Sequence, residues 1–446
     1  MPNRDGGNRM RKPQVLKGMR DFLPDQMLLR QHVIGSFESV FQRYGFEPID
    51  TPVLEYIEAL TGKYGEDEKL IYHFEDHGGR EVGLRYDLTV PLARFVATHR
   101  HELTFPFKRY HIAPVFRADR PQRGRYREFW QCDVDTVGTS SMLADAEVLM
   151  VWMDCLKAVN MPNFVVQINH RKLLQSLAAF AGVPSDQTPT IHRAIDKLDK
   201  IGRDGVKEEM LRHDVPAEAA DKVLDLVALT GNPSEVLAEL RLRLDGIETA
   251  KEGIEDLESL FTYLGEMAAD PRHYALNLAL ARGLDYYTGP VFEATVAEAN
   301  ISSLGGAGRY DGLIGMFIGE DIPATGASLG VERIVDVIQE LALMPPRATV
   351  SEVMVTIFDD QMLAPSLALV AKLRSEGVAA EIYLEPHRDL RRQVQYANKR
   401  GIPVVAFLGP DESSRGEVNL RVMESGEQTT VKQSEAAEAV KRLAGA

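Results

Sequence analysis

Residues 107–138 read FKRYHIAPVFRADRPQRGRYREFWQCDVDTVG, and this stretch decides the fold. Apolar and polar residues alternate on both sides of an arginine-rich middle, which is the pattern of two antiparallel strands joined by a loop. The loop runs from Arg117 to Arg127 and also contains Arg120, Arg123 and Arg125. The sequence therefore predicts a long hairpin that carries a cluster of guanidinium groups.

The arginine cluster contrasts with the rest of the chain, which is acidic. The 446 residues carry a formal net charge of −15 at pH 7. A guanidinium group is planar and can bind two phosphate oxygens at once. We therefore interpret the loop as a site for a polyphosphate or an RNA backbone. The alternative is a solvated loop that only aids solubility.

Five segments resemble one enzyme family. The hairpin resembles motif 2 of the class II aminoacyl-tRNA synthetases, most closely that of the histidyl-tRNA synthetases. LRYDLT (84–89) resembles their amino-group-binding strand, and GASLGVERI (326–334) resembles motif 3 of the class. ARGLDYYTGPVFE (281–293) and GGAGRYDGL (305–313) resemble two peptides specific to the histidine enzymes. The resemblance extends from about Lys17 to the C-terminus.

The resemblance implies a fold, an activity and a set of partners. The fold would be an α+β catalytic domain with a central antiparallel sheet, an all-helical insertion, and a C-terminal α/β domain like the anticodon-binding domains. The activity would be that of a histidine–tRNA ligase, which activates L-histidine with ATP and transfers it to the 3′ end of tRNA(His). Mg²⁺ would bind mainly through the ATP phosphates, without a metal site made by protein alone. The protein would be a homodimer.

Four residues would bind ATP by their place in these motifs. Arg117 would hold the α-phosphate and Arg125 the γ-phosphate. Phe129 would stack on adenine, because a flat apolar ring suits the face of a base. Arg333 would bind ATP from the other side; its alternative is an ordinary charge on a helix surface.

Arg282 lies between Ala281 and Gly283, in a setting where a charge is costly unless it is paired. The resemblance places it beside the α-phosphate and the substrate carboxylate. We therefore predict that Arg282 and Arg117 are catalytic, with Arg282 stabilising charge in the transition state. A buried ion pair between Arg282 and Asp285 is the alternative.

The resemblance also implies a histidine pocket, made of Asp87, Thr89, Gln131, Asp135, Arg282, Tyr286, Tyr287 and Tyr310. Asp87 and Thr89 would bind the α-amino group, and Gln131 would bind the substrate carboxylate. A neutral imidazole has one donor and one acceptor nitrogen, which tyrosine hydroxyls and a carboxylate can both satisfy. Without the resemblance, tyrosines in strands would be interpreted as core residues.

Three positions depart from the family pattern. Asp87 and Asp135 stand where many relatives carry Glu. Ala307 stands where many relatives carry Gly, and its methyl group is tolerated only if the backbone φ there is negative.

The pattern along the chain divides it into five parts, of which three are a disordered basic tail (1–16), a helical insertion (182–265) and a linker (341–351). The resemblance implies that residues 17–181 and 266–340 form the catalytic domain and residues 352–446 the anticodon-binding domain. In the last part, strands alternate with helices, which predicts a mostly parallel sheet. Its basic helix would bind the anticodon through Arg388, Arg391, Arg392 and Lys399; a solvated helix is the alternative.

A helix is predicted over Met27–Tyr44, followed by a strand-like segment up to and beyond Pro52. Its apolar residues between 28 and 41 share one face. The segment resembles motif 1, which builds a dimer interface in the family. A plain core helix satisfies the same pattern.

Composition favours a cytoplasmic enzyme. No apolar run reaches the roughly 18 residues of a membrane helix, and the N-terminus has no apolar signal core. Cys132 and Cys155 form no disulfide framework or metal motif, which suits a reducing compartment. Two other functions compete, namely a regulatory relative that serves histidine biosynthesis and a class II synthetase for another amino acid.

Overall fold

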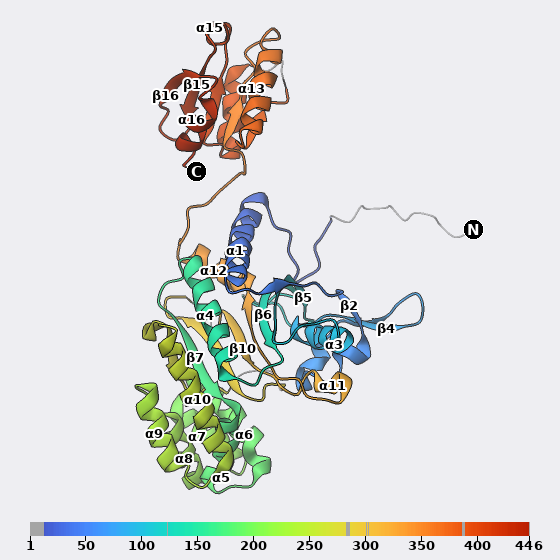
Figure 1. Ribbon diagram of the computed structural model, residues 1–446, viewed down its shortest axis with the longest axis vertical. Helices are drawn as coiled ribbons and strands as arrows, with labels where there is room; N and C mark the ends of the chain where they lie inside the picture. The colour runs from blue at the N-terminus through green and yellow to red at the C-terminus, as the bar shows by residue number, and fades with distance from the viewer. Residues whose placement is uncertain are drawn as a thin grey trace, which may run out of the picture. The chain divides into compact units, whose positions relative to one another are not determined.

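The computed structural model describes residues 13–122, 124–281, 286–299, 301, 303–385 and 389–445 (Figure 1). The chain forms two compact units. The first contains the segment up to Asp21 and residues Val33–Met344; the second contains Phe22–His32 and Pro345–Ala446. Their boundary falls within helix α1 (Pro24–Arg43).

The predicted hairpin is confirmed as strands β5 (Phe107–Phe116) and β6 (Glu128–Val137). They pair antiparallel along their whole length, with Phe107 opposite Val137 and Phe116 opposite Glu128. The arginine-rich segment joins them as a loop.

The hairpin lies in an eight-stranded sheet, and its neighbours come from distant parts of the sequence. All pairs are antiparallel except β1 with β5 and β7 with β8. This confirms the predicted α+β domain with a central antiparallel sheet. The order is β1 (Glu47–Pro48), β5, β6, β11 (Ala324–Gly330), β10 (Gly305–Arg309), β9 (Pro290–Val296), β7 (Phe164–His170) and β8 (Tyr274–Leu276).

Most of helix α4 (Met142–Ala158) is buried, including Trp152. It packs between β11 and helix α10 (Glu248–Glu266), so it has no broad polar face (Figure 1). A smaller sheet has the strand order β2 (Leu54–Tyr56), β4 (Glu81–Leu84) and β3 (His73–Glu75). The helices of this region are α2 (Ile57–Leu60), α3 (Thr89–His99), α11 (Gly315–Ile318) and α12 (Val331–Glu340).

The region predicted as an all-helical insertion is helical. Between β7 and β8, the structure has no strand, and apolar residues at helical spacing form the core between helices, for example Val223 and Leu257. Besides α10, the helices of this region are α5 (Arg171–Ala181), α6 (Thr188–Ile195), α7 (Leu198–Arg212), α8 (Ala217–Val227) and α9 (Pro233–Arg243).

The second unit has its own five-stranded sheet, in the order β13 (Ala380–Ile382), β12 (Val353–Val355), β14 (Val404–Phe407), β15 (Glu417–Val422) and β16 (Gln428–Lys432). The first three strands are parallel, as predicted, but β15 and β16 are antiparallel. The five residues between β15 and β16 are too few for a crossover, which needs a dozen or more. The helices are α13 (Leu363–Ser375), α14 (Leu390–Arg400), α15 (Pro410–Ser414) and α16 (Ala436–Leu443).

The apolar face of α1 is part of the core. Val33, Phe37, Val40 and Phe41 are all buried within the chain. The ring of Phe41 lies 5.5 Å from that of Tyr110 on β5, measured between centroids. For these four residues the core interpretation is therefore correct, and the prediction that they form a dimer interface is wrong.

Candidate active site

One cavity of about 500 Å³ opens beside the hairpin in the first unit. Its walls come from the segment 84–89, from β6 and the arginine loop, and from β9, β10 and β11. Most of the predicted site residues line it, namely Asp87, Thr89, Arg117, Arg125, Phe129, Gln131, Asp135, Tyr286, Tyr287, Tyr310 and Arg333. Arg282 and its suggested partner Asp285 lie outside the described residues.

Strand β6 sets the order of groups along this cavity. Alternate residues of a strand share a face and lie about 6.6 Å apart, so Phe129 and Asp135 are separated by about 20 Å. Gln131 and Asp133 lie between them on the same face. The cavity is therefore long, with the ring of Phe129 toward one end and Asp135 toward the other.

The end near Phe129 is lined by arginines. The guanidinium of Arg117 lies 4.2 Å above the ring of Tyr86 and 5.1 Å from that of Phe129. Its Nε donates to the Tyr86 carbonyl oxygen over 3.1 Å. The arginine is thus held by two aromatic rings while it lines the cavity.

Two further arginines complete this end. Arg333 donates to the carbonyl oxygens of Gly124, at 3.1 Å, and Ser303, at 2.9 Å. These two hydrogen bonds join the arginine loop to the segment before β10. Arg333 is therefore not an ordinary solvated charge on a helix surface. Arg125 is more exposed and lies 3.5 Å from a carboxylate oxygen of Asp119.

The opposite end is acidic and buried. Asp87 accepts hydrogen bonds from the hydroxyls of Tyr64, at 2.8 Å, and Tyr286, at 3.2 Å, and from the Val90 backbone N–H at 3.0 Å. Burial raises its pKa in spite of these donors. A cationic group bound beside Asp87 would favour its ionised form.

Asp135 has two partners inside the chain. The hydroxyl of Tyr310 donates to one of its carboxylate oxygens, and Arg109 lies 2.7 Å from the other. Arg109 is fully buried and stands opposite Asp135 in the strand register. The site residues predicted from the sequence do not include Arg109, although an arginine in a buried strand is a sign of an internal ion pair.

Asp133 is a further cavity residue that sequence reasoning missed. It is 1% exposed and stands in register between His111 on β5 and Ser328 on β11. Burial raises its pKa to about 8. Its position two residues before Asp135, hence on the same face, was the available signal.

The raised pKa of Asp133 makes stability depend on pH. The native carboxyl holds its proton up to about pH 8, whereas its unperturbed value is 3.8, so stability is lost as the pH rises between these values. Asp133→Asn keeps a neutral group of the same shape. We expect its Tm to exceed that of the wild type by at least about 4 °C at pH 8.5, with a smaller difference at pH 5.

Thermal unfolding at several pH values measures this difference. The matched control is Asp204→Asn, because Asp204 is exposed. A Tm difference for Asp133→Asn that does not change with pH would contradict the assignment.

The predicted tyrosines meet at the acidic end. The ring centroid of Tyr286 lies 5.0 Å from that of Tyr287 and 5.9 Å from that of Tyr310. Tyr287 packs over Gly308, where a Cβ would come within 2.8 Å of the ring. Ala307 is buried within β10. It is not among the described non-glycine residues whose backbone φ is positive. The backbone at this position therefore tolerates the methyl group of alanine.

The predicted anticodon residues lie in the second unit. Arg391, Arg392 and Lys399 are exposed on α14, and their side chains form no ion pair with other described residues. Arg388 lies outside the described residues.

Three features concern metals, membranes and thiols. In the described ranges, no group of three or more His, Cys, Asp or Glu side chains is placed to hold a metal ion. No helix of the described chain has the length and apolar character needed to cross a membrane. Cys132 and Cys155 are buried free thiols.

Comparison with known proteins identifies the family of this chain. The family profile described as Histidyl-tRNA synthetase matches residues 18–334, and that of an anticodon binding domain matches residues 352–443. A Histidine--tRNA ligase from Aeropyrum pernix is 43% identical over 97% of this chain and 98% of its own length. One from Rhodopirellula baltica is 42% identical over 95% and 96%.

A solved structure extends the similarity to three dimensions. The crystal structure of histidyl-tRNA synthetase from Nostoc is 32% identical, with a TM-score of 0.88 over 96% of this chain and 99% of that one. The family profile covers more than two thirds of the present sequence, and the acidic, tyrosine-lined cavity lies within it. The chain therefore belongs to the histidyl-tRNA synthetase family.

Proposed function

We propose that the protein activates L-histidine with ATP, forming histidyl-adenylate and pyrophosphate, and then transfers the histidine to the 3′ end of tRNA(His). Family membership makes it an ATP-using aminoacyl-tRNA ligase. One observation carries the choice of chemistry. A single cavity has arginines beside an aromatic ring at one end and buried carboxylates with tyrosines at the other.

At the acidic end, Asp87 and Thr89 bind the α-amino group in this proposal. The imidazole lies among Asp135, Tyr287 and Tyr310, whose oxygens can accept from one ring nitrogen and donate to the other. A side chain without such nitrogens would leave these buried groups unpaired, and this strongly disfavours it.

At the other end, the adenine stacks on Phe129, and Arg117 binds the α-phosphate next to it. Arg125 and Arg333 take the outer phosphates. The Arg117 guanidinium, held over Tyr86, is fixed before the reaction, so it can stabilise charge on the phosphate oxygens without reorganising. Gln131 lies between the two ends on β6 and binds the histidine carboxylate there.

Arg282 and Mg²⁺ complete the proposed chemistry. Arg282 keeps the role implied by its family position, beside the α-phosphate. Mg²⁺ would arrive with ATP, held by its phosphate oxygens, and neutralise part of their charge.

The tRNA engages the second unit through α14. Its exposed cations suit an RNA backbone, and Tyr396, which is 38% exposed, suits an unstacked base. Since charged tRNA serves translation, the proposal places the protein in the cytoplasm.

Histidine-dependent exchange of pyrophosphate into ATP tests the first step. We expect exchange with histidine and none with proline, threonine or glycine. The paired variant Arg391→Glu/Arg392→Glu should keep this exchange but charge tRNA poorly, with a weaker salt dependence, because it removes phosphate contacts.

These assays also separate the alternatives. Exchange with another amino acid at the same rate would refute the histidine pocket. Loss of exchange and of charging together in the α14 variant would refute the division between the two units. If no amino acid supported exchange of pyrophosphate into ATP, the result would favour the regulatory role in histidine biosynthesis instead.

We also propose a homodimer, but through a different surface from the buried face of α1. Val53, Leu54, Tyr56 and Phe74 are apolar and exposed on or beside the small sheet. Val53 also lines a hollow of about 530 Å³ that contains Pro52.

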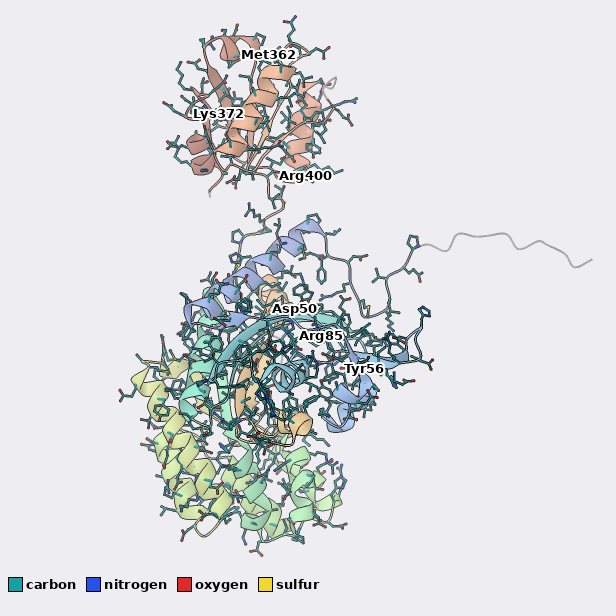
Figure 2. The ribbon with its side chains drawn as sticks, turned by 45° about the vertical axis from the view of Figure 1, so that its right-hand side comes forward. Asp50, Tyr56, Arg85, Met362, Lys372 and Arg400 are labelled. Atoms are coloured by element: carbon teal, nitrogen blue, oxygen red, sulfur yellow. The ribbon has the colours of Figure 1, made fainter. Side chains whose placement is uncertain are left out.

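This hollow also contains the buried Arg85 and the carboxylate of Asp50, whose side chain is 86% exposed (Figure 2). A second copy would cover this surface by a two-fold contact. Sedimentation at micromolar concentration should give twice 49.7 kDa, and Tyr56→Lys should shift the protein toward monomer. Leu242→Lys, on an exposed site of α9, should not. A wild-type mass near 49.7 kDa would refute the dimer.

A further inference from the structure

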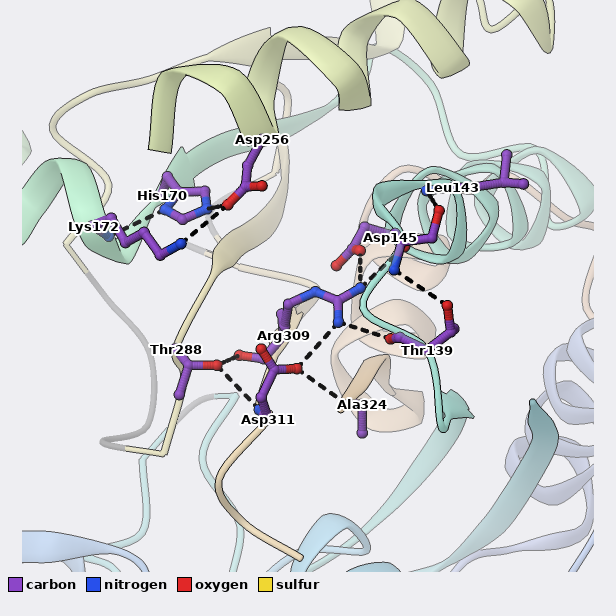
Figure 3. A network of polar contacts seen from close by, with 11 residues as sticks. Thr139, Leu143, Asp145, His170, Lys172, Asp256, Thr288, Arg309, Asp311 and Ala324 are labelled. Carbon is purple, nitrogen blue, oxygen red and sulfur yellow. Dashed lines mark hydrogen bonds and ion pairs between the residues drawn. The ribbon is translucent and has the colours of Figure 1, made fainter. Parts of the chain in front are cut away.

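A buried ion pair lies behind the histidine pocket. Arg309 is 3% exposed and Asp145 is fully buried, and an Nη2–H of Arg309 donates to the Asp145 carboxylate (Figure 3). Arg309 is the last residue of β10, directly before Tyr310. Neighbouring residues of a strand face opposite sides. Tyr310 therefore reaches Asp135 in the cavity, whereas Arg309 reaches α4 on the other side.

The guanidinium of Arg309 has four acceptors. Nη1 donates to the Thr139 carbonyl at 3.0 Å and to the Asp311 carboxylate at 3.1 Å (Figure 3). Nη2 donates to the Ser141 carbonyl at 3.2 Å as well as to Asp145. Burial alone would lower the pKa of Arg309, but the two carboxylates raise it, so the group stays charged.

Further hydrogen bonds join the two peptides that resemble those of the histidine enzymes, residues 281–293 and 305–313, through their described residues. The Thr288 backbone N–H donates to the Arg309 carbonyl over 2.8 Å, and the Asp311 backbone N–H donates to the Thr288 hydroxyl over 3.1 Å. Thr288 follows Tyr287, and Arg309 and Asp311 flank Tyr310. The two tyrosines that frame the imidazole are thus tied to each other through their immediate neighbours.

A third contact fixes the strand at this point. The Tyr310 backbone N–H donates to the Ala324 carbonyl over 2.8 Å, and the Asp311 carboxylate accepts from the Ala324 N–H at 3.3 Å. Asp311 therefore joins β11 to the guanidinium of Arg309. None of these groups lines the cavity, except Tyr310 itself.

We propose that Arg309, with Asp145, is a positioning residue that sets the two tyrosine hydroxyls for histidine recognition. The proposal rests on the histidine pocket proposed above. The arginines that face ATP belong to the loop after β5 and to α12, so the effect should fall on histidine rather than on ATP. Accurate placement matters here, because a pocket that selects by buried hydrogen bonds loses affinity when its groups move.

Arg309→Lys tests the proposal. Lysine keeps the charge, but its compact ammonium has three donors and no planar fork, so it cannot serve acceptors on both sides. We expect the KM for histidine to rise at least about tenfold, kcat to change less, and the KM for ATP to stay within about twofold. Arg272→Lys is the control, since Arg272 forms an equivalent pair with Asp270 on the surface.

A second variant pair separates positioning from stability. Arg309→Met leaves Asp145 buried without its cationic partner and should lower the Tm. Arg309→Met/Asp145→Leu removes both charges and should recover much of that Tm, because an apolar pair can replace a buried ion pair. The KM for histidine should remain raised in the double variant, since the guanidinium bonds that tie the tyrosine peptides to Thr139, Ser141 and Asp145 are then absent.

Three results would overturn the proposal. These are an unchanged KM for histidine in Arg309→Lys, an equal rise in the KM for ATP, or a double variant that regains both the Tm and the wild-type KM. Failure of the wild-type protein to activate histidine would instead refute the proposed function, so the two failures are distinguishable.

Discussion

Arg117→Met should lower histidine-dependent pyrophosphate exchange by about 10²–10³-fold, the usual cost of removing one fixed electrostatic donor. Methionine keeps the unbranched apolar stem, but it is shorter and loses the charged guanidinium that lies over the rings of Tyr86 and Phe129. The loss should fall mainly on kcat, because the phosphate charge that Arg117 stabilises grows in the transition state. The measurement is the exchange rate at saturating histidine and ATP.

The matched control for this prediction is Arg120→Met in the same loop. Arg120 is exposed, and it is not one of the described residues that line the cavity. Both variants should unfold at the wild-type temperature. If Arg117→Met retained near-wild-type exchange, its proposed contact with the α-phosphate would be wrong; if the control lost as much activity, the loop as a whole would be acting rather than Arg117.

Gly326→Ala should reduce kcat/KM for histidine by about 10²-fold or more. A Cβ built on Gly326 overlaps the Asp135 carboxylate and lies 2.8 Å from the Val134 carbonyl oxygen. The carboxylate must then turn away from its bonds to Tyr310 and Arg109, and the imidazole loses its acceptor. A charged hydrogen bond lost from a buried site costs about 1.5–3 kcal/mol, which is about 10- to 150-fold, and displacement of Tyr310 adds to it.

Gly312→Ala provides the control for Gly326→Ala. It lies two residues after Tyr310, and a Cβ there meets nothing within 4 Å. We expect normal kinetics for Gly312→Ala and a normal KM for ATP in both variants. A Gly326→Ala enzyme that bound histidine as well as the wild type would show that the pocket tolerates a displaced Asp135, and would remove this carboxylate from recognition.

Local pattern was sufficient for the main elements of the fold. The alternation of residues 107–138 predicted the β5–β6 hairpin, because every second side chain of a strand faces the same side. Charged segments with apolar residues three and four apart predicted the helices between β7 and β8. In the sheet of the second unit, the prediction of parallel strands is wrong only after Phe407. The connections there are too short for a crossover, so β15 and β16 pair antiparallel.

The residues that line the cavity could be predicted from the sequence only because their motifs resemble those of a known family. A tyrosine in a strand or an arginine in a loop has an equally good structural interpretation, and the sequence contains no distance that could decide between them. The tertiary structure decided between the interpretations of Arg333, because its guanidinium joins Gly124 to Ser303. It also decided between a core and an interface position for Val33 and Phe37, because both are buried in the core.

The sequence by itself determined which segments are strands and helices, since these depend on the period of apolar residues within about ten positions. Only the tertiary structure decided which strands are neighbours. Register across β5, β6 and β11 places Arg109, Asp135 and Gly326 side by side, although the last is 191 residues from Asp135 in the chain. The role of each depends on the other two. Arg109 offsets the buried charge, and the missing side chain of Gly326 leaves room for the carboxylate, which no local pattern records.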